Sequence, residues 1–402
     1  MSKEIPSPYK GGLQLEIHRH RPPTPFGYEH CIQYDDPNDG RPWKTYNYFW
    51  GDRAGLVDFA LAHPPMNTEP LTPDPEQTQV ATLTIHEVVR DLKDEQTAEG
   101  PTLLRGQIST ADGQPTLNVL PKLYDAVFNS IDGGLEYGYI DPVTQADLDY
   151  SKEAAAYKDI DEAGLCGSAA LVYLGSWTAD IPIDNEAGGM RPVRMILLQE
   201  TGIERARTMA EIIEEHRIVD RSRLPALPVR LEVLKNFLDA ENKIWWFADV
   251  EHDDPSPDDF LVRKDNTEAL MSFQHSIVYN HVPSKRDKSW VAYEKGRTNT
   301  PELMPNPVLR QWPFIPYSER STWWEWVPEE WLEDPELATI WLLETFALSE
   351  AFKRNYQPLP NEFLNSHERG DRGAKLLALL EQLGRNSGAT SEDEDEEKVP
   401  GH

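Results

Sequence analysis

Cysteine is almost absent from this sequence, whose 402 residues include only Cys31 and Cys166. The two lie far apart and form no C-x-x-C unit, so the sequence predicts neither a disulfide framework nor a structural zinc site. The chain also lacks an apolar run long enough to span a bilayer and an apolar N-terminal signal segment. We therefore expect a soluble intracellular protein, cytoplasmic or nuclear, that does not insert into membranes.

Basic residues are scarce relative to acidic ones. The chain has 39 Lys and Arg against 69 Asp and Glu, which gives a formal net charge of −30. A chain this acidic repels nucleic-acid phosphates and anionic membrane surfaces. We therefore expect a protein partner or a small-molecule substrate, with no nucleic acid and no membrane. The acidic run at residues 391–397 cannot bury a core, so residues 386–402 are predicted to form a disordered tail.

Proline is abundant, with 33 residues in the chain, and many of them lie near the N-terminus. Residues 1–79 combine these prolines with glycines and clustered aromatic residues. This composition favours loop-like backbone with little helix. We predict that the segment is an irregular extension rather than part of the regular fold.

Beyond residue 80 the sequence indicates regular secondary structure. Alternating β-branched residues predict strands at 81–89, 102–108, 116–124, 171–177 and 193–199, with a helix at 147–160 after the third strand. After residue 202 the pattern becomes mainly helical, with helices expected at 206–216, 229–248, 339–352 and 374–383. The expected fold class is therefore α+β, with a five-stranded antiparallel sheet followed by a helical half.

Two short segments carry a more specific pattern. The stretch from His252 to Val262 resembles the H-R-D-L-x-x-x-N catalytic loop of protein kinases, with Asp254 at the catalytic Asp and Asp259 at the metal-binding Asn. Val119-Leu120-Pro121-Lys122 resembles the V-A-I-K strand of the same proteins. Glu153, in the following helix, stands where the ion-pair partner of that lysine is expected.

The sequences of these segments, and their order along the chain, are similar to those of a group of fungal protein-kinase-like proteins. The similarity covers roughly residues 80–383. The resemblance implies a degenerate, bilobal protein-kinase fold, with an N-lobe at residues 80–201 and a C-lobe at residues 202–385. It implies ATP and Mg²⁺ as cofactors. Lys122 would reach the nucleotide phosphates, Asp254 would orient the acceptor hydroxyl, and Asp259 would bind the metal.

The sequence departs from the kinase pattern in three places. No G-x-G-x-x-G lies between the first two strands, where residues 91–100 are acidic instead. Ser272-Phe273-Gln274 stands where D-F-G is expected, so Ser272 replaces the charged Mg²⁺ ligand. No A-P-E follows. These departures favour a pseudokinase or weakly active kinase with a binding or regulatory role.

Other interpretations remain open at this stage. The chain could be an active, divergent ATP-dependent phosphotransferase acting on a protein or small-molecule hydroxyl, or an enzyme that uses the same cleft for another reaction. Lys122 could equally be a surface lysine, and Glu153 could simply favour the helix dipole in a first turn. Asp254 could belong to a solvated loop, and Ser272 could be a polar residue ending a strand. His252 is expected to make a structural hydrogen bond rather than act as a base.

Overall fold

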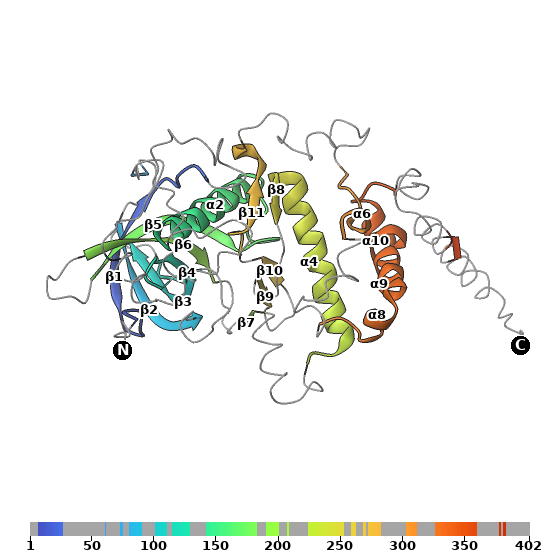
Figure 1. Cartoon of the computed structure of the whole chain (residues 1–402), viewed down its shortest axis with the longest axis horizontal. Helices are drawn as coiled ribbons and strands as arrows, with labels where there is room; N and C mark the ends of the chain where they lie inside the picture. Colours follow the sequence, from blue (N-terminus) through green and yellow to red (C-terminus); the bar gives the residue numbers. More distant parts are fainter. Residues whose placement is uncertain are drawn as a thin grey trace, which may run out of the picture.

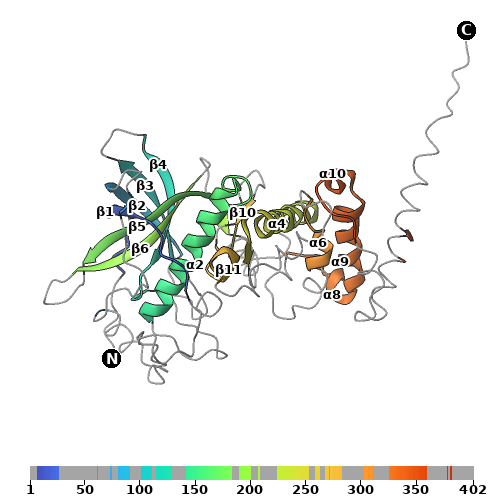
Figure 2. The same ribbon diagram turned by 90° about the horizontal axis from the view of Figure 1, so that it is seen from above.

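In the computed structural model, the described residues form a barrel at one end of the molecule and short helices at the other (Figures 1 and 2). The described residues are 7–26, 61, 73–74, 80–90, 101–110, 115–128, 142–182, 190–200, 207–208, 224–252, 259–262, 268–270, 272–282, 303–311, 326–359, 378 and 381–382. The predicted acidic tail lies outside them, and the predicted domain boundaries stay predictions.

Six antiparallel strands close into a barrel in the order β1-β2-β3-β4-β6-β5. The strands are β1 (Gln14–His20), β2 (Val80–Arg90), β3 (Thr102–Thr110), β4 (Leu117–Tyr124), β5 (Val172–Pro182) and β6 (Met190–Gln199). Alternate residues of each strand point inward, and side chains such as Ile17, Leu83 and Leu197 are fully buried there. Burial of these side chains gives the barrel a core of its own.

The expected five-stranded sheet with an irregular N-terminal extension is wrong, because β1 adds a sixth strand. Ile17 stands opposite Ala81 of β2 and Ala179 of β5, so β1 joins two strands that would otherwise be edges. The physical reason lies in its alternation, since Leu15 and Ile17 are buried while Glu16 and His18 are exposed. That period-2 pattern was obscured by the proline-rich sequence that follows it.

Helix α2 (Pro142–Glu162) packs against the outer face of the barrel (Figures 1 and 2). Ala154, Ala155 and Ala156 are buried, and these small residues let the helix backbone approach its neighbours closely. Tyr150 and Tyr157 are also fully buried. A helix that is buried around most of its circumference belongs to the interior of the molecule. It lies between the barrel and described residues that follow residue 226.

Helix α4 (Leu227–Ala248) confirms the helix expected at 229–248. It begins with a proline in its first turn, which suits a position where no backbone N–H is needed. It ends at Asp249, whose φ of 55° is left-handed. The Phe237 ring meets the Phe260 ring edge-on, with centroids 4.0 Å apart. This contact joins the helix to the short strands that follow it.

The expectation of a helical C-lobe, and with it the expected bilobal kinase arrangement, is also wrong. After residue 202 the described residues contain two small sheets, β10-β9-β7 and β11-β8, besides the helices. The strands are β7 (Arg207–Thr208), β8 (Val250–His252), β9 (Phe260–Val262), β10 (Glu268–Leu270) and β11 (Ser276–Val278). The 3₁₀ helix η3 (Tyr279–His281) follows β11 directly.

Most of the remaining helices are short. They are α6 (Pro307–Gln311), α8 (Glu330–Glu333), α9 (Pro335–Leu342), the π-helix η5 (Leu343–Leu348) and α10 (Glu350–Lys353). The single helix expected at 339–352 is thus divided, because Ser349 takes an extended conformation. A strand, β7, stands where the helix at 206–216 was expected, and residues 209–216 lie outside the described residues. Short apolar runs do not distinguish a buried helix from a strand by periodicity.

The packing divides into two cores that share the barrel wall. Inward-facing residues such as Val119 and Leu123 belong to the barrel core. The outward-facing Leu120 and Tyr124 of the same strand belong to a second core, together with α2 and α4. Within the described ranges, no helix is both long enough and apolar enough to cross a membrane.

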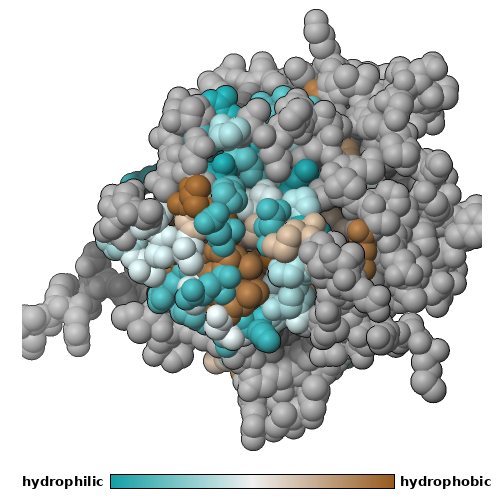
Figure 3. Space-filling model, turned by 90° about the vertical axis from the view of Figure 1, so that its left-hand side faces the viewer, coloured by the Kyte–Doolittle hydropathy of each residue, from teal (hydrophilic) through white to brown (hydrophobic). Residues whose placement is uncertain are grey.

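The barrel end of the molecule carries hydrophobic residues among hydrophilic ones (Figure 3). Val80, Leu117 and Met190 are exposed at the starts of β2, β4 and β6. β2 and β4 run in the same direction, and β6 runs opposite to β4. Met190 therefore lies at the other end of the barrel wall from Val80 and Leu117. Such separated apolar side chains are ordinary on protein surfaces and identify no binding face.

Candidate functional site

Lys122 and Glu153 meet in the seam between the barrel and α2. β4 lies between β3 and β6, so its backbone is paired on both sides. The alternation of the strand turns Leu120, Lys122 and Tyr124 away from the barrel interior and toward α2. Lys122 Nζ donates to Glu153 Oε1 as a buried ion pair, with the two side chains 3% and 0% exposed. The interpretation of Lys122 as a surface lysine is therefore wrong.

Glu153 is held by two further donors. The Tyr124 hydroxyl donates to Oε2, and the Phe273 backbone N–H donates to Oε1 at 3.0 Å. Burial, followed by the negative charge of Glu153, raises the pKa of Tyr124 well above its usual value, so the phenol keeps the proton that it donates. Because α2 begins at Pro142, Glu153 lies outside its first turn, and the dipole interpretation of this residue is wrong.

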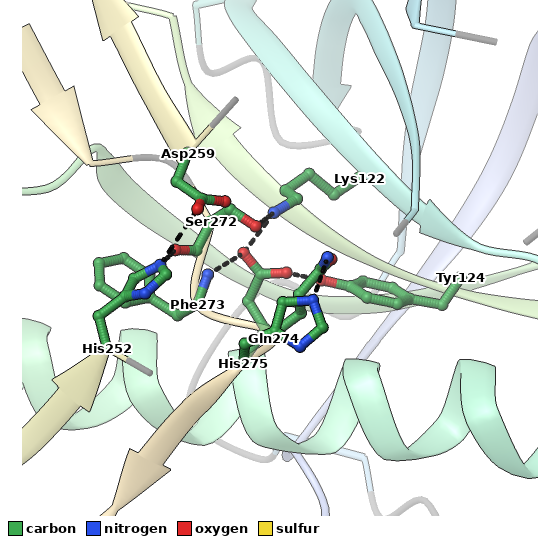
Figure 4. Close-up of polar contacts among 9 residues, drawn as sticks. Lys122, Tyr124, His252, Asp259, Ser272, Phe273, Gln274 and His275 are labelled. Atoms are coloured by element: carbon green, nitrogen blue, oxygen red, sulfur yellow. Dashed lines mark hydrogen bonds and ion pairs between the residues drawn. The ribbon is translucent and has the colours of Figure 1, made fainter. Parts of the chain in front are cut away.

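Ser272 lies beside the ammonium group. Its Oγ is 3.2 Å from Lys122 Nζ, and its side chain is buried (Figure 4). The interpretation of this serine as no more than a polar strand end does not account for the contact. A hydroxyl at this position offers the lysine a neutral hydrogen-bond partner rather than a second negative charge.

His252 fixes the other side of the segment that contains Ser272. Its Nε2 lies 2.9 Å from the Ser272 carbonyl oxygen and 3.5 Å from Asp259 Oδ2. Both side chains are buried. The structural hydrogen bond expected of His252 is thus present. Figure 4 shows His252 on the opposite side of Ser272 from Lys122.

The Phe273 ring packs between the histidine and the helix. It meets Tyr157 edge-on with centroids 5.1 Å apart and lies 6.0 Å from the His252 ring. The side chain is fully buried. Its backbone N–H and its ring therefore both attach residues 272–273 to α2, the first through Glu153 and the second through Tyr157.

The structure brings together four of the five predicted site residues: Lys122, Glu153, Asp259 and Ser272. Asp254 lies outside the described residues, as does the acidic connection at 91–100. Among the residues that the structure describes, no group of three or more His, Cys, Asp or Glu side chains could hold a metal ion. Mg²⁺ binding by Asp259 and Ser272 therefore stays a prediction.

Sequence reasoning missed Tyr124, Gln274 and His275 as site residues. The amide Nε2 of Gln274 lies 3.0 Å from His275 Nε2 (Figure 4). The period-2 alternation of β4 was sufficient to place Tyr124 on the same face as Lys122. For the other two residues the sequence held no comparable signal, because the irregular backbone at 272–275 has no fixed periodicity.

Comparisons with known proteins add little to this geometry. No family model matches the chain, and no curated protein does either. The solved structures that resemble it include the ROP18 kinase domain in complex with AMP-PNP and sucrose, at a TM-score of 0.32 and 13% identity, covering 55% of this chain and 59% of that one. One of the structural neighbours is thus a kinase domain, and the similarity to it is low.

Two further structures resemble the chain at similar levels. They are the complex of Rv3197 with erythromycin from Mycobacterium tuberculosis, at a TM-score of 0.24 and 13% identity over 46% of each chain, and WbdD, at 0.26 and 12% identity over 70% of this chain and 43% of that one. The chain spans less than two thirds of the length of all three structures. Similarities at TM-scores this low carry no argument about function.

Proposed function

We propose that this chain is a protein-kinase-like protein with a degenerate phosphotransfer site, a pseudokinase that binds a ligand or partner in a regulatory role. The observation that carries the proposal is the position of Ser272, whose hydroxyl lies 3.2 Å from Lys122 Nζ. Phosphoryl transfer by kinases needs a carboxylate there to hold Mg²⁺ against the phosphates. A serine hydroxyl is a weaker, uncharged ligand for a hard cation.

The surrounding contacts support a kinase-like site rather than an unrelated polar cluster. A strand lysine and a helix glutamate form a buried ion pair, as the kinase mechanism requires. The resemblance of the Lys122, His252 and Ser272 segments to three kinase motifs comes from sequence. In the fold, Lys122 contacts the Ser272 hydroxyl and His252 contacts the Ser272 backbone carbonyl oxygen.

The charges in the seam argue against fast chemistry. Asp259 supplies a carboxylate beside His252, and the ion pair between Lys122 and Glu153 leaves neither of these charges for a metal. Because Ser272 is neutral, the described residues supply only one carboxylate for a metal. Kinases hold the metal with the Asp of D-F-G and the Asn of the catalytic loop, near the catalytic Asp. We therefore expect weak Mg²⁺ affinity, and ATP binding that gains little from the metal.

The test compares nucleotide binding with and without metal in Ser272→Asp and Ser272→Asn. The two replacements have the same size, and only the first adds a negative charge. We expect ATP to raise the melting temperature of the wild type equally with and without Mg²⁺, and we expect Ser272→Asp alone to gain a Mg²⁺-dependent increase. Rapid Mg-ATP turnover by the wild type, abolished by Asp254→Ala, would overturn the proposal.

A second candidate function is an active, divergent phosphotransferase acting on a protein or small-molecule hydroxyl. The intact ion pair between Lys122 and Glu153, together with the buried Asp259, favours it. The same turnover measurement separates the two functions, because transfer of the γ-phosphate to an acceptor identifies the active enzyme. An absence of any ATP-induced change in melting temperature would count against both.

A further inference from the structure

His20 attaches the barrel-closing strand directly to the helix that carries Glu153. Its Nε2 lies 2.5 Å from the Tyr150 hydroxyl of α2, and its Nδ1 lies 3.2 Å from Thr178 Oγ1 of β5. His20 is 5% exposed and Tyr150 is 0% exposed. A buried hydrogen bond between two elements fixes their relative position, because breaking it leaves two polar groups without water.

A second buried contact reinforces the first. Arg194 of β6 donates to Asp147 Oδ1 of α2 at 2.5 Å, and its guanidinium lies over the Tyr150 ring at 5.7 Å. Asp147 and Tyr150 are one turn apart on the helix. The first half of α2 is therefore attached to the barrel at two places, through β1 and through β6.

The attachment continues from Tyr150 to the ion pair. Tyr150 and Glu153 are three residues apart, so they are neighbours on the helix surface. The Tyr124 ring meets the Tyr150 ring edge-on with centroids 5.3 Å apart, and the Tyr124 hydroxyl donates to Glu153. One side chain of β4 thus touches both the residue that His20 holds and the residue that Lys122 holds.

We propose that His20 is a positioning residue for the site: through Tyr150, strand β1 fixes α2 so that Glu153 stays against Lys122. The N-terminal segment then holds the ion pair in place, in addition to closing the barrel. The part of this inference that concerns nucleotide binding rests on the proposed function. The part that concerns the placement of the helix does not.

The test removes one hydroxyl, with Tyr150→Phe, and measures hydrogen exchange of the backbone amides around Glu153. The matched control is Tyr9→Phe, since the Tyr9 hydroxyl also makes a buried bond from the N-terminal segment, at 2.6 Å to Asp125 Oδ2, a residue outside α2. We expect Tyr150→Phe to speed exchange in α2 about ten-fold, the factor that corresponds to about 1.4 kcal/mol. Amides of α4 should stay unchanged in both variants.

A second variant, His20→Gln, keeps a side chain that can hydrogen-bond to Tyr150. We expect its α2 amides to exchange more slowly than those of Tyr150→Phe. Equal exchange in α2 for Tyr150→Phe, Tyr9→Phe and the wild type would overturn the inference. So would an increase of the same factor in α2 and α4, because it would show general destabilisation rather than positioning.

Nucleotide binding is measured on the same variants through the ATP-induced change in melting temperature. We expect the change to be smaller in Tyr150→Phe than in the wild type and to be retained in Tyr9→Phe. If ATP has no effect on the wild type, the proposed function fails, whereas the exchange experiment still decides whether His20 positions the helix. The two failures are therefore distinguishable.

Discussion

Burial of either Lys122 or Glu153 alone would cost a large desolvation free energy, whereas burial of the two together offsets much of that cost. Each is almost fully removed from water, and each supplies the opposite charge that the other needs. Tyr124 and Phe273 add hydrogen bonds to the carboxylate, which satisfies lone pairs that the lysine does not reach. A buried ion pair of this kind adds little to stability overall, but loss of one partner leaves an uncompensated charge in the interior.

We predict that Lys122→Met lowers the free energy of unfolding by about 3–5 kcal/mol, because Glu153 then stays buried without its counter-charge. Lys122→Met combined with Glu153→Gln should lose less than the sum of the two single variants. Urea unfolding of the four proteins in a double-mutant cycle measures the difference.

The control for this cycle is the exposed pair on the same helix, Lys158 and Glu162, whose Nζ and Oε1 atoms are 2.7 Å apart. Lys158→Met should cost no more than about 0.5 kcal/mol, as is usual for an i,i+4 surface pair. Equal losses at the buried and exposed pairs would contradict the burial argument.

His20 provides a prediction about pH. Burial, and then the nearby Arg194 charge, lower its pKa from 6.5 to about 4. Between these two values the unfolded chain binds a proton at this site that the folded chain does not, so stability rises with pH across the window. The contribution of His20 is fully present above about pH 6.5 and is lost as the pH falls toward 4.

The measurement is urea unfolding at several pH values for the wild type and His20→Gln. From pH 7 to pH 4, the wild type should lose up to about 3 kcal/mol more than the variant, since each pKa unit corresponds to about 1.4 kcal/mol. Taking the difference between the two proteins removes the effect of the other titrating groups. Parallel curves would show that His20 does not have the lowered pKa.

At the scale of elements, β1 is the part on which barrel closure depends. Without it, β2 and β5 each present an unpaired edge, and unpaired edges favour association between chains. Its removal also uncovers the core around Ile17, which is otherwise fully buried.

We predict that deletion of residues 1–20 lowers the free energy of unfolding by at least about 3 kcal/mol, from the lost burial of Leu15 and Ile17 alone. The shortened chain should also elute as larger species in size-exclusion chromatography. Deletion of residues 1–6, which precede the described strand, is the control and should change neither property. A monomeric shortened chain with an unchanged melting temperature would show that the barrel does not need β1.

The sequence predicted the long periodic elements better than the short ones. The five strands expected between residues 80 and 201 are present as β2 to β6, and α4 was expected almost at its observed bounds. Their periodic patterns extend over seven residues or more. β1 was missed because proline-rich sequence follows it, and β7 was taken for helix because two residues carry no period.

At the scale of the whole molecule, the site lies where two cores meet. β4 contributes its inner face to the barrel core and its outer face to the core that contains α2 and α4. The ion pair lies on the outer face of β4, on the side of the core that contains α2. The contact of β1 with Tyr150 lies on one side of this ion pair, and the contact with Ser272 lies on the other.

Residue types alone indicate which side chains could carry chemistry, because charge and hydrogen-bonding capacity belong to the side chain itself. The resemblance of four segments to kinase motifs predicts Lys122, Glu153, Asp259 and Ser272 as site residues. It takes the folded chain to show that these residues converge, that six strands rather than five close the sheet, and that Tyr124 and His20 contact the same helix. These contacts join residues that are distant in sequence, and local periodicity contains no information about which distant residues will meet.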